Sequence, residues 1–469
     1  MWTPIIIAVE IVWVASIGVV ILLQRRSATS TLAWLLALTL LPIVGYIIYR
    51  LIGPQRLERK RVKRSLSKAA VREVMEAQAK LADNLLEHQQ LARVGVELGE
   101  ASPLRASEVE LFFDGNAAYT SILGCIAAAK HHVHLEYYIW DPDTIGTEMR
   151  DALIDRAKAG VQVRMVVDAT GSNNLTKAFF SPLRAAGVKI ALFNPIRLRS
   201  LRLRRPDFRT HRKIIVCDGR VGFTGGMNIT DNQSESRSKD FWRDTHIRIT
   251  GAAVWPLQRM FMEDWYYAAD ELCPVTDETF PTPTQEGEHL VQIIGSGPDS
   301  ASFAIHKMFF TAANQSQDRL WMTTPYFVPD EALLMAITSA ALRDCDVRLL
   351  VPKKGDSRVV DLAARSYFPE LLEAGVRIYE YETRFIHAKT IVCDDDVAIV
   401  GTANLDNRSF RLNFEVAAIV FGRTANTTLA DAFTKDLQDA REILRSDFER
   451  QPFKARLGQA GARLISPLL

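Results

Sequence analysis

The chain has 469 residues, which is longer than one hydrophobic core usually organises, so two or more domains are expected. Its 57 Lys and Arg residues nearly balance its 55 Asp and Glu residues, which excludes a protein that is cationic or anionic throughout and makes any electrostatic attraction local. The five cysteines lie far apart and form no CxxC pair, a pattern that indicates reduced, mostly buried thiols rather than a zinc site or a redox couple.

Two long apolar stretches open the chain. Residues 4–23 (PIIIAVEIVWVASIGVVILL) and 31–52 (TLAWLLALTLLPIVGYIIYRLI) are each long enough to cross the roughly 30 Å apolar core of a bilayer as a helix. Neither has the polar face of a soluble core helix, and an uncharged start followed by two long stretches is unlike a cleaved signal peptide. The sequence therefore predicts a transmembrane helical hairpin over residues 1–52.

Cations gather where the second apolar stretch ends. They are Arg50, Arg56, Arg59, Lys60, Arg61, Lys63, Arg64, Lys68 and Arg72, against one acid, Glu58. Because Lys and Arg near a span tend to stay cytoplasmic, both ends of the hairpin and the rest of the chain are expected on the cytoplasmic side. Residues 53–108 are interpreted as a basic connector, helical over 60–98, whose cations would lie against anionic headgroups.

From about residue 109 the pattern alternates between strands and helices, and the order occurs twice. The predicted series are strand 132–140, helix 147–160 and strand 161–168, then strand 318–330, helix 331–344 and strand 345–352. This internal duplication predicts an α/β protein with two halves, 109–272 and 290–469. A polar, Pro- and Thr-rich segment, 273–289, is interpreted as the linker between them.

Each half contains one copy of a polar motif. The copies are THRKIIVCDGRVGFTGGMN (210–228) and IHAKTIVCDDDVAIVGTAN (386–404), with equal spacings from His to Lys, Asp and Asn. The matched residues are His211, Lys213, Asp218 and Asn228 in the first copy and His387, Lys389, Asp394 and Asn404 in the second. Residues i and i+2 of a strand share a face, so each His is expected to project with its Lys. Two halves packed about a pseudo-twofold axis would bring the four side chains to one site.

The paired motifs resemble the HKD motifs of the phospholipase D superfamily, with Gly-Gly-x-Asn and Gly-Thr-x-Asn where that family commonly has Gly-Ser-x-Asn. The paired apolar stretches, FRTHRKI, TPYFVPDEAL and GTANLDNRSFRLNFE are more particularly similar to bacterial cardiolipin synthases, over nearly the whole chain. The resemblance implies two pseudo-twofold-related phospholipase D-like halves, each a mixed β-sheet flanked by helices. It also implies a two-pass protein of the bacterial inner membrane, with its catalytic part on the cytoplasmic side.

Phosphodiester exchange requires an in-line nucleophile, a counter-charge for the phosphoryl oxygens and a proton for the leaving alcohol. One histidine would attack to form a phosphohistidine, and the other would act as acid and then as base. Lys213, Lys389, Asn228 and Asn404 would hold the phosphoryl oxygens, with no metal or other cofactor required. The resemblance favours His211 as the nucleophile, and the pseudosymmetry leaves that choice open.

Four acids are assigned supporting roles. Asp244 and Glu415 match the family's supporting acids, which fix the tautomer of a buried imidazole. Asp218 and Asp394 belong to the motifs and are expected to hold turns and strands rather than to touch substrate. Around the first motif histidine, residues 196–212 (IRLRSLRLRRPDFRTHR) contain seven arginines and one acid, which suggests capture of an anionic headgroup or a bilayer surface, with a solvated loop as the alternative.

The activity that the resemblance implies is transfer of a phosphatidyl group from one phosphatidylglycerol to another, with release of glycerol. Hydrolysis to phosphatidic acid, or transfer that uses phosphatidylethanolamine, would begin with the same half-reaction and stays open. The membrane hairpin argues against a nuclease, so no nucleic acid partner is expected, and two intact motifs argue against an inactive lipid-binding scaffold. The sequence does not indicate whether the protein self-associates.

Overall fold

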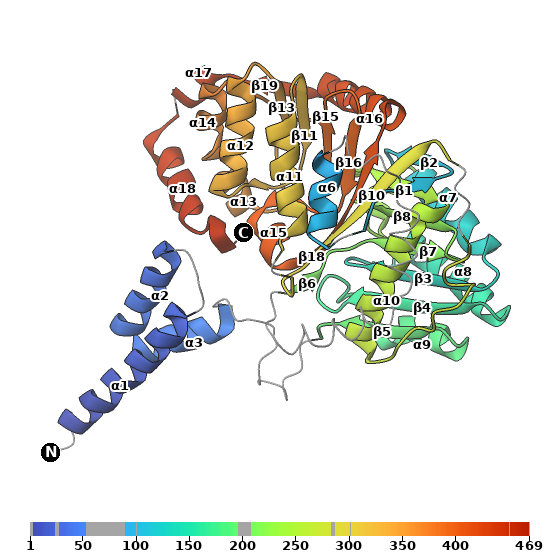
Figure 1. Cartoon of the computed structure of the whole chain (residues 1–469), viewed down its shortest axis with the longest axis horizontal. Helices are drawn as coiled ribbons and strands as arrows, with labels where there is room; N and C mark the ends of the chain where they lie inside the picture. Colours follow the sequence, from blue (N-terminus) through green and yellow to red (C-terminus); the bar gives the residue numbers. More distant parts are fainter. Residues whose placement is uncertain are drawn as a thin grey trace. The chain divides into compact units, whose positions relative to one another are not determined.

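The computed structural model describes residues 3–23, 28–52, 90–99, 101–195, 208–282, 287–300, 302–449 and 451–468. The chain divides into two units: residues 1–58 with 196–207, and residues 59–195 with 208–469. The second unit contains both motifs and is called the catalytic unit below (Figure 1).

The described residues of the N-terminal unit form three helices, α1 (Thr3–Leu22), α2 (Ala28–Leu40) and α3 (Pro42–Ile52). Ile21, Leu38 and Tyr49 form its small buried cluster. The predicted second span, 31–52, is not one continuous helix, because Pro42 has no N–H to bond to the preceding turn and separates α2 from α3. Among the residues that the structure describes, no helix combines the length and the apolar character that crossing a membrane requires.

The catalytic unit contains two mixed sheets. The first has the order β2-β9-β8-β7-β3-β4-β5, with bounds β2 (Val109–Phe112), β9 (His246–Thr250), β8 (Val221–Gly225), β7 (Ile214–Cys217), β3 (His132–Tyr137), β4 (Gln162–Asp168) and β5 (Lys189–Phe193). The second has the order β1-β10-β18-β16-β15-β11-β13-β14-β19, with bounds β1 (Leu104–Ala106), β10 (His289–Ser296), β18 (Asn413–Phe421), β16 (Val397–Gly401), β15 (Thr390–Cys393), β11 (Arg319–Thr323), β13 (Asp346–Pro352), β14 (Arg377–Tyr381) and β19 (Ala440–Ile443).

The duplication is visible strand by strand. In both sheets three parallel strands (β3-β4-β5 and β11-β13-β14) continue into an antiparallel series (β7-β8-β9 and β15-β16-β18). Each His-x-Lys segment directly precedes the first strand of its antiparallel series, β7 or β15. The two halves therefore present equivalent edges, and they confirm the predicted mixed α/β architecture.

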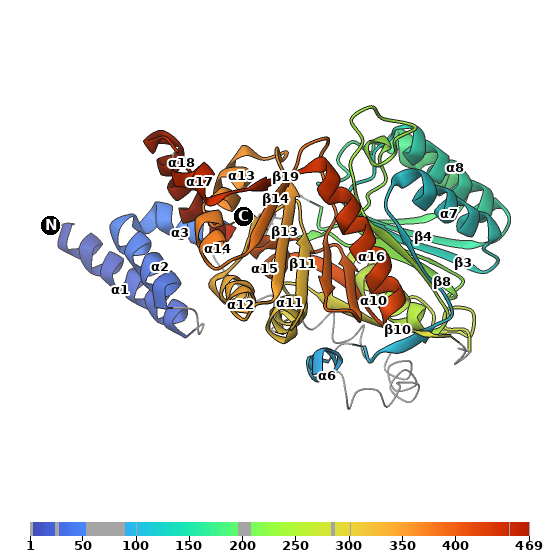
Figure 2. The same ribbon diagram turned by 90° about the horizontal axis from the view of Figure 1, so that it is seen from above.

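Helices cover the outer faces of the sheets. In the first half these are α7 (Gly115–Ala128), α8 (Thr144–Lys158) and α9 (Lys177–Ala185), and in the second α11 (Ala304–Gln315), α12 (Glu331–Leu342), α13 (Arg358–Arg365) and α14 (Phe368–Glu373). The remaining short elements are α6 (Gln90–Glu97), β12 (Phe327–Val328), η3 (Asp231–Gln233), η4 (Ala252–Val254), η5 (Leu437–Asp439), β17 (Leu405–Asp406), α15 (Asn407–Arg411), α17 (Arg445–Glu449), α18 (Phe453–Leu464) and η6 (Ser466–Leu468). Two longer helices, α10 (Trp255–Ala269) and α16 (Arg423–Asp436), contact strands of both sheets at the junction of the halves (Figure 2).

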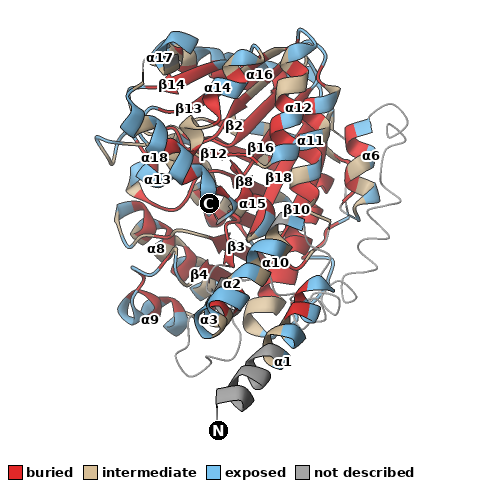
Figure 3. Ribbon diagram, turned by 90° about the vertical axis from the view of Figure 1, so that its left-hand side faces the viewer, coloured by how far each residue is buried: buried red, intermediate tan, exposed pale blue. Residues whose placement is uncertain are grey.

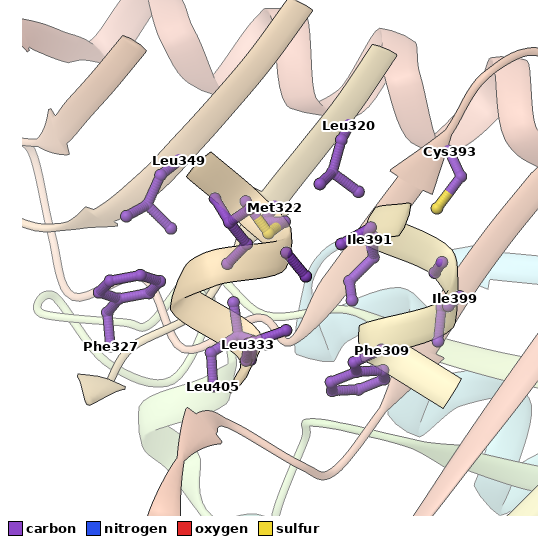
Figure 4. Close-up of a cluster of buried hydrophobic side chains, with 14 of the residues drawn as sticks. Phe309, Leu320, Met322, Phe327, Leu333, Leu349, Ile391, Cys393, Ile399 and Leu405 are labelled. Carbon is purple, nitrogen blue, oxygen red and sulfur yellow. The ribbon is translucent and has the colours of Figure 1, made fainter. Parts of the chain in front are cut away.

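Apolar side chains fill three main layers. One lies between α7 to α9 and the first sheet, and another lies between α11 to α14 and the second sheet, where Leu320, Met322, Phe327 and Leu349 meet (Figure 4). The third lies between the two sheets, with branched side chains of β7, β9, β10, β15, β16 and β18. Burial follows this layering, because the strands are mostly buried and the helices expose their outer faces (Figure 3).

Backbone pairing also joins the halves directly. The two-residue strand β6 (Arg209–Thr210) leaves the first half and pairs with β18 of the second, and Arg243 forms the corresponding bridge with Ile386. Arg212, which is fully buried, donates from Nε to the carbonyl oxygen of Glu415 at 3.1 Å and from Nη2 to that of Ser296 at 3.3 Å. Each half therefore depends on the other for part of its backbone hydrogen bonding near the motifs.

Most predicted strands and helices are found close to their expected bounds, and four of the five cysteines are buried. In the predicted connector, residues 53–89 lie outside the described residues, Gln90–Glu97 forms α6, and Leu104–Ala106 forms β1 at the edge of the second sheet. In the predicted linker, Cys273 and Phe280 are buried against α10. The described segments that precede and follow the first half therefore both pack against helices or strands of the catalytic unit.

The buried Arg212 gives a prediction about stability. Its guanidinium forms an ion pair with Asp264, and both side chains are almost fully buried. Replacing Arg212 with Ala leaves the carboxylate without its partner, so we expect the free energy of unfolding to fall by about 3–5 kcal/mol. Urea unfolding of the solubilised full chain measures this change. The partly exposed ion pair of Arg150 with Asp151 supplies the control, because Arg150→Ala should cost about 1 kcal/mol or less. Equal losses would show that Arg212 is not structurally important.

Candidate active site

His211 lies directly after β6, where the chain of the first half crosses to the second sheet. Its backbone N–H donates to the carbonyl oxygen of Phe414 at 2.8 Å, and its Nδ1 lies 3.0 Å from Oε2 of Glu415. Two further donors hold the Glu415 carboxylate, the Asn413 amide at 3.1 Å and the Thr402 hydroxyl. The carboxylate that holds the imidazole of the first motif, and the carbonyl that accepts from its backbone, therefore both belong to the second half.

His387 has the mirror arrangement. Its backbone N–H donates to the carbonyl oxygen of Arg243 at 2.7 Å, and its Nδ1 lies 2.7 Å from Oδ2 of Asp244. The Asp244 carboxylate also accepts from the backbone N–H of Thr245 at 2.7 Å and from the Gln233 amide at 3.3 Å. Here the first half orients the imidazole of the second motif.

The two carboxylates determine which ring nitrogen carries the proton. An ionised carboxylate can only accept a hydrogen bond, so Nδ1 of each imidazole is the donor and Nε2 keeps its lone pair. Burial lowers the pKa of His211 to about 4, with Glu415 opposing the shift, and lowers that of His387 to about 3, with Asp244 opposing it. Both imidazoles are therefore neutral near pH 7, with Nε2 able to act as a nucleophile or a base.

Lys213 and Lys389 are buried beside these imidazoles. Lys213 Nζ donates to the carbonyl oxygen of His211 at 2.8 Å, and Lys389 Nζ makes the equivalent bond to His387. Burial, together with the charge of Lys389, lowers the pKa of Lys213 to about 7, and burial lowers that of Lys389 to about 8. The charges of both lysines also act on both imidazoles, so the four side chains form one electrostatic cluster.

The supporting acids complete the charge balance of this cluster. Burial acts to raise the pKa of Asp244 and of Glu415, but the neighbouring imidazoles and lysines outweigh it and lower both values. The two carboxylates are therefore ionised. With both lysines protonated, two negative charges balance two positive ones around two neutral imidazoles. An entering phosphodiester adds one negative charge, which favours protonation of a lysine or an imidazole in the site.

The local structure of the His-x-Lys segments differs from the expectation. Neither His211 to Lys213 nor His387 to Lys389 lies within a strand, because both segments are extended chain between two strands. The physical reason is that each segment passes from one sheet to the other, β6 pairing with β18 before β7 joins the first sheet. His and Lys still meet, through the bond from the ammonium to the histidine carbonyl rather than through strand alternation.

The motif asparagines are buried and only partly hydrogen-bonded. Asn228 accepts at its side-chain oxygen from the backbone N–H of Ile139 at 3.4 Å, while its Nδ2 has no partner among the described residues. Asn404 donates to the carboxylate of Asp406, and its Oδ1 has no partner within the same described set. Asn228 thus has a buried N–H donor available for a phosphoryl oxygen.

The motif aspartates lie at the other end of their strands, away from the imidazoles. Asp218 accepts from the backbone N–H groups of Lys130, His131 and His132, each at 2.8 Å. Asp394 accepts from three successive backbone N–H groups at the start of β11 in the same way. Both residues adopt positive φ, 53° and 43°, at a turn. They hold the start of the neighbouring parallel strand and do not join the polar cluster.

The two departures from Gly-Ser-x-Asn occupy equivalent positions with different roles. A Cβ at Gly226 would lie 2.0 Å from Oδ1 of Asp244, so only glycine leaves room for that carboxylate. The equivalent Thr402 uses its hydroxyl to hold Glu415. Each variant residue is therefore matched to the acid that it contacts.

Aromatic side chains that the sequence analysis did not assign to the site pack against the imidazoles. Tyr138, just after β3, lies edge-on to His211 with ring centroids 4.9 Å apart, and Lys213 Nζ lies 5.5 Å from the centroid of the same ring. Trp242 lies at 5.3 Å from His387. Tyr138 follows the carboxyl end of the parallel strand β3, and Trp242 lies two residues before Asp244. These positions in the sequence, after a strand end and beside a supporting acid, are the signal that could have assigned both aromatic residues to the site.

Two arginines of the arginine-rich segment are buried and are not available to a ligand. Residues 196–207 lie outside the described residues, whereas Arg209 and Arg212 are buried. Arg209 Nη1 lies 3.8 Å from Oδ1 of Asp168, and Arg212 pairs with Asp264. Both guanidinium groups are engaged by carboxylates of the first half, and Arg212 also donates to carbonyl groups of the second half, so the prediction that these two arginines capture anions is wrong. Among the described residues no group of three or more His, Cys, Asp or Glu side chains is arranged to hold a metal ion.

Comparison with known proteins gives consistent matches. Residues 122–265 and 309–437 match a family model described as "Cardiolipin synthase, PLD-like domain", and residues 11–54 match one described as "Phospholipase_D-nuclease N-terminal". A cardiolipin synthase of Alkalihalophilus pseudofirmus is 41% identical over 466 residues, 97% of this chain and 92% of that protein. A cardiolipin synthase of Geobacillus kaustophilus is 42% identical over 460 residues, 97% and 91% of the two chains.

Solved structures share the fold at low sequence identity. The phosphatidylserine synthase of Haemophilus influenzae superposes with a TM-score of 0.64 at 15% identity, covering 81% of this chain and all of the other. The polyphosphate kinase of Porphyromonas gingivalis superposes with a TM-score of 0.51 at 12% identity, covering 76% of this chain and 52% of the other. These likenesses concern the fold alone.

The crossed carboxylates can be tested by isosteric amides. In Glu415→Gln and Asp244→Asn the amide can donate to Nδ1 and so stabilise the tautomer with its proton on Nε2. We expect each variant to keep its fold and to lose roughly 10²–10⁴-fold in turnover of a phosphodiester substrate. Glu370→Gln, at an exposed carboxylate, is the control and should retain full activity. Near-normal turnover in both site variants would mean that the carboxylates do not orient the imidazoles.

The depressed lysine pKa values predict proton uptake on anion binding. Because the pKa of Lys213 is about 7 and that of Lys389 is about 8, Lys213 is mostly deprotonated and Lys389 is about half deprotonated in the free protein at pH 8. Tungstate, a phosphate analogue, should restore their charge, so roughly one proton should be taken up per anion bound. Calorimetry in buffers of different ionisation enthalpy measures this number, and Lys213→Met should reduce it. Tungstate binding without proton uptake would contradict the assigned pKa values.

Proposed function

The chain belongs to the cardiolipin synthase family of phospholipase D-like proteins, and we propose that it is a cardiolipin synthase that transfers the phosphatidyl group of one phosphatidylglycerol to another and releases glycerol. The observation that carries the proposal is the pair of neutral imidazoles, each held at Nδ1 by a carboxylate of the other half, beside two buried ammonium groups. This arrangement supplies a nucleophile, an acid-base group and counter-charge for one phosphodiester.

We assign the first half-reaction to attack by Nε2 of His211 on phosphorus. The N–P bond forms as the P–O bond to the glycerol headgroup breaks, and His387, protonated once the anionic substrate is bound, gives its proton to the leaving oxygen. Lys213, Lys389 and the free Nδ2 of Asn228 stabilise charge on the non-bridging oxygens. Glycerol leaves, and a phosphatidyl group remains on His211.

The second half-reaction reverses the proton flow. His387, now neutral, takes the proton of a headgroup hydroxyl on the second phosphatidylglycerol, whose oxygen attacks phosphorus as the N–P bond breaks. The products are cardiolipin and an enzyme with its starting proton count. One phosphodiester replaces another, so the exchange needs no nucleotide as an energy source. The choice of His211 rather than His387 as the nucleophile follows the family resemblance.

We also propose that residues 1–52 anchor the protein as a two-pass hairpin in the cytoplasmic membrane, with residues 109–272 and 290–469 forming the catalytic halves on the cytoplasmic side. Support comes from the apolar side chains exposed on the described part of the helices, among them Val19, Leu22, Leu32 and Leu40. The cations that follow residue 52 supply the orientation by charge. Membrane phospholipids are then both the surroundings and the substrates.

Product analysis tests the proposed reaction. The solubilised full chain, incubated with labelled phosphatidylglycerol and EDTA, should form cardiolipin and glycerol in equal amounts. Removing either motif imidazole, in His211→Ala or His387→Ala, should lower the rate by at least about 10³-fold. His131→Ala, at an exposed histidine outside the motifs, is the control. Phosphatidic acid as the main product would identify a hydrolase. Cardiolipin formed only when phosphatidylethanolamine is added would identify a different second substrate.

A further inference from the structure

The C-terminal helix α18 carries an apolar stripe that no described residue of the catalytic unit covers. Phe453, Leu457 and Leu464 are 75%, 60% and 83% exposed, whereas Gln459 and Ala462 on the opposite side are buried. At about 100° per residue, the three exposed side chains lie within about 40° of one another around the helix axis. Figure 3 shows α18 at the surface of the unit. The exposure is therefore one continuous stripe rather than scattered residues.

Cations border this stripe. Around the helix axis, Lys454 lies roughly 100° from Phe453 on one side of the stripe, and Arg456 lies roughly 60° from Phe453 on the other side. Both are exposed, and neither forms an ion pair with another described residue of the catalytic unit. Arg463, by contrast, donates to the carbonyl oxygen of Ser366 and lies over the ring of Tyr367. An apolar centre with basic edges is typical of a helix that lies in the interface of an anionic bilayer.

The helix is tied to the segment that carries the second motif. Immediately after α18, Ser466 in η6 accepts at its carbonyl oxygen from the Asn407 amide at 3.3 Å, and its hydroxyl accepts from Tyr367 at 3.1 Å. Asn407 begins α15, three residues after Asn404 of the motif. A surface bound by α18 is consequently linked through two short elements to the site itself.

We propose that α18 docks the catalytic unit onto an anionic phospholipid bilayer, with Phe453, Leu457 and Leu464 inserted among the lipids and Lys454 and Arg456 at the headgroups. The proposal rests on the proposed function in that the substrate is a bilayer lipid. A stable protein partner usually covers about 800 Å² per side, which is far more than three side chains provide. The cations at both edges complement anionic headgroups, so the bilayer is the occupant that fits.

The position of α18 can be measured on the full chain. A fluorophore is attached at Leu457→Cys in a Cys125→Ser background, since the other four cysteines are buried. In nanodiscs that contain phosphatidylglycerol its emission should shift to the blue and acrylamide quenching should fall, relative to nanodiscs of phosphatidylcholine alone. The same fluorophore at Asp155→Cys, an exposed position on α8, should change little. Equal protection in both lipids and in detergent would indicate that protein covers the stripe, which overturns the proposal.

Kinetics provide the second readout. The triple variant Phe453→Ser, Leu457→Ser, Leu464→Ser should raise the apparent KM for phosphatidylglycerol in vesicles by about tenfold or more. Its kcat on monomeric short-chain phosphatidylglycerol should stay within about twofold of the parent, because the site is unchanged. The control variant, Met335→Ser with Leu342→Ser, removes side chains that are 69% and 72% exposed on another helix, α12.

The outcomes separate the two proposals. An unchanged KM in vesicles for the triple variant, with normal turnover by the parent protein, overturns the docking role and leaves the transferase assignment intact. If the parent protein turns over neither vesicle nor short-chain phosphatidylglycerol, the assigned function fails instead. A loss of kcat on the short-chain substrate in the triple variant would show that α18 supports the fold of the site, which also overturns the docking role.

Discussion

The active centre depends on one constraint, which is that each buried imidazole is held by a carboxylate from the opposite half of the molecule. His211 is bound by Glu415 and His387 by Asp244, and in each pair the histidine N–H also bonds to the carbonyl group just before the acid. These contacts fix the tautomer, with the proton on Nδ1 and the lone pair on Nε2, while burial keeps both imidazoles neutral. Because the pairs cross, neither half can assemble its own reactive group, and this explains why the halves also share β6, the Arg243 bridge and the buried Arg212.

Duplication supplies the scaffold, and local differences adapt it to two unlike acids. Glycine at 226 leaves space for the short side chain of Asp244, whereas Thr402 at the equivalent position donates its hydroxyl to the longer Glu415. Burial also controls the protonation of the site. It lowers the pKa of both histidines, which keeps them neutral, and the pKa of both lysines, so an anionic substrate promotes protonation within the site. Substrate binding and acid-base competence are coupled in this way.

Features that follow from the pattern of residues could be predicted from the sequence, whereas features that depend on contacts between distant segments could not. Alternating strands and helices, the duplication and the two motifs follow from spacing, and the structure contains them. Spacing cannot tell which half an acid faces, so Asp244 and Glu415 were named without their crossed partners. The strand expected at His211 to Lys213 is extended chain because it passes between sheets. Pro42 divides the second apolar stretch, and Arg209 and Arg212 are buried in ion pairs rather than available for capture.

The crossed pairing is tested most directly by asking which step each acid supports. Rapid-quench experiments with labelled phosphatidylglycerol follow both glycerol release and protein-bound, acid-labile phosphorus in four variants. Glu415→Gln should impair the same step as His211→Ala, so that little phosphoryl-enzyme forms. Asp244→Asn should reproduce His387→Ala, with slow protonation of the leaving glycerol and slow transfer to the second lipid. If Asp244→Asn instead matches His211→Ala and Glu415→Gln matches His387→Ala, the acids act within their own halves and the account is contradicted.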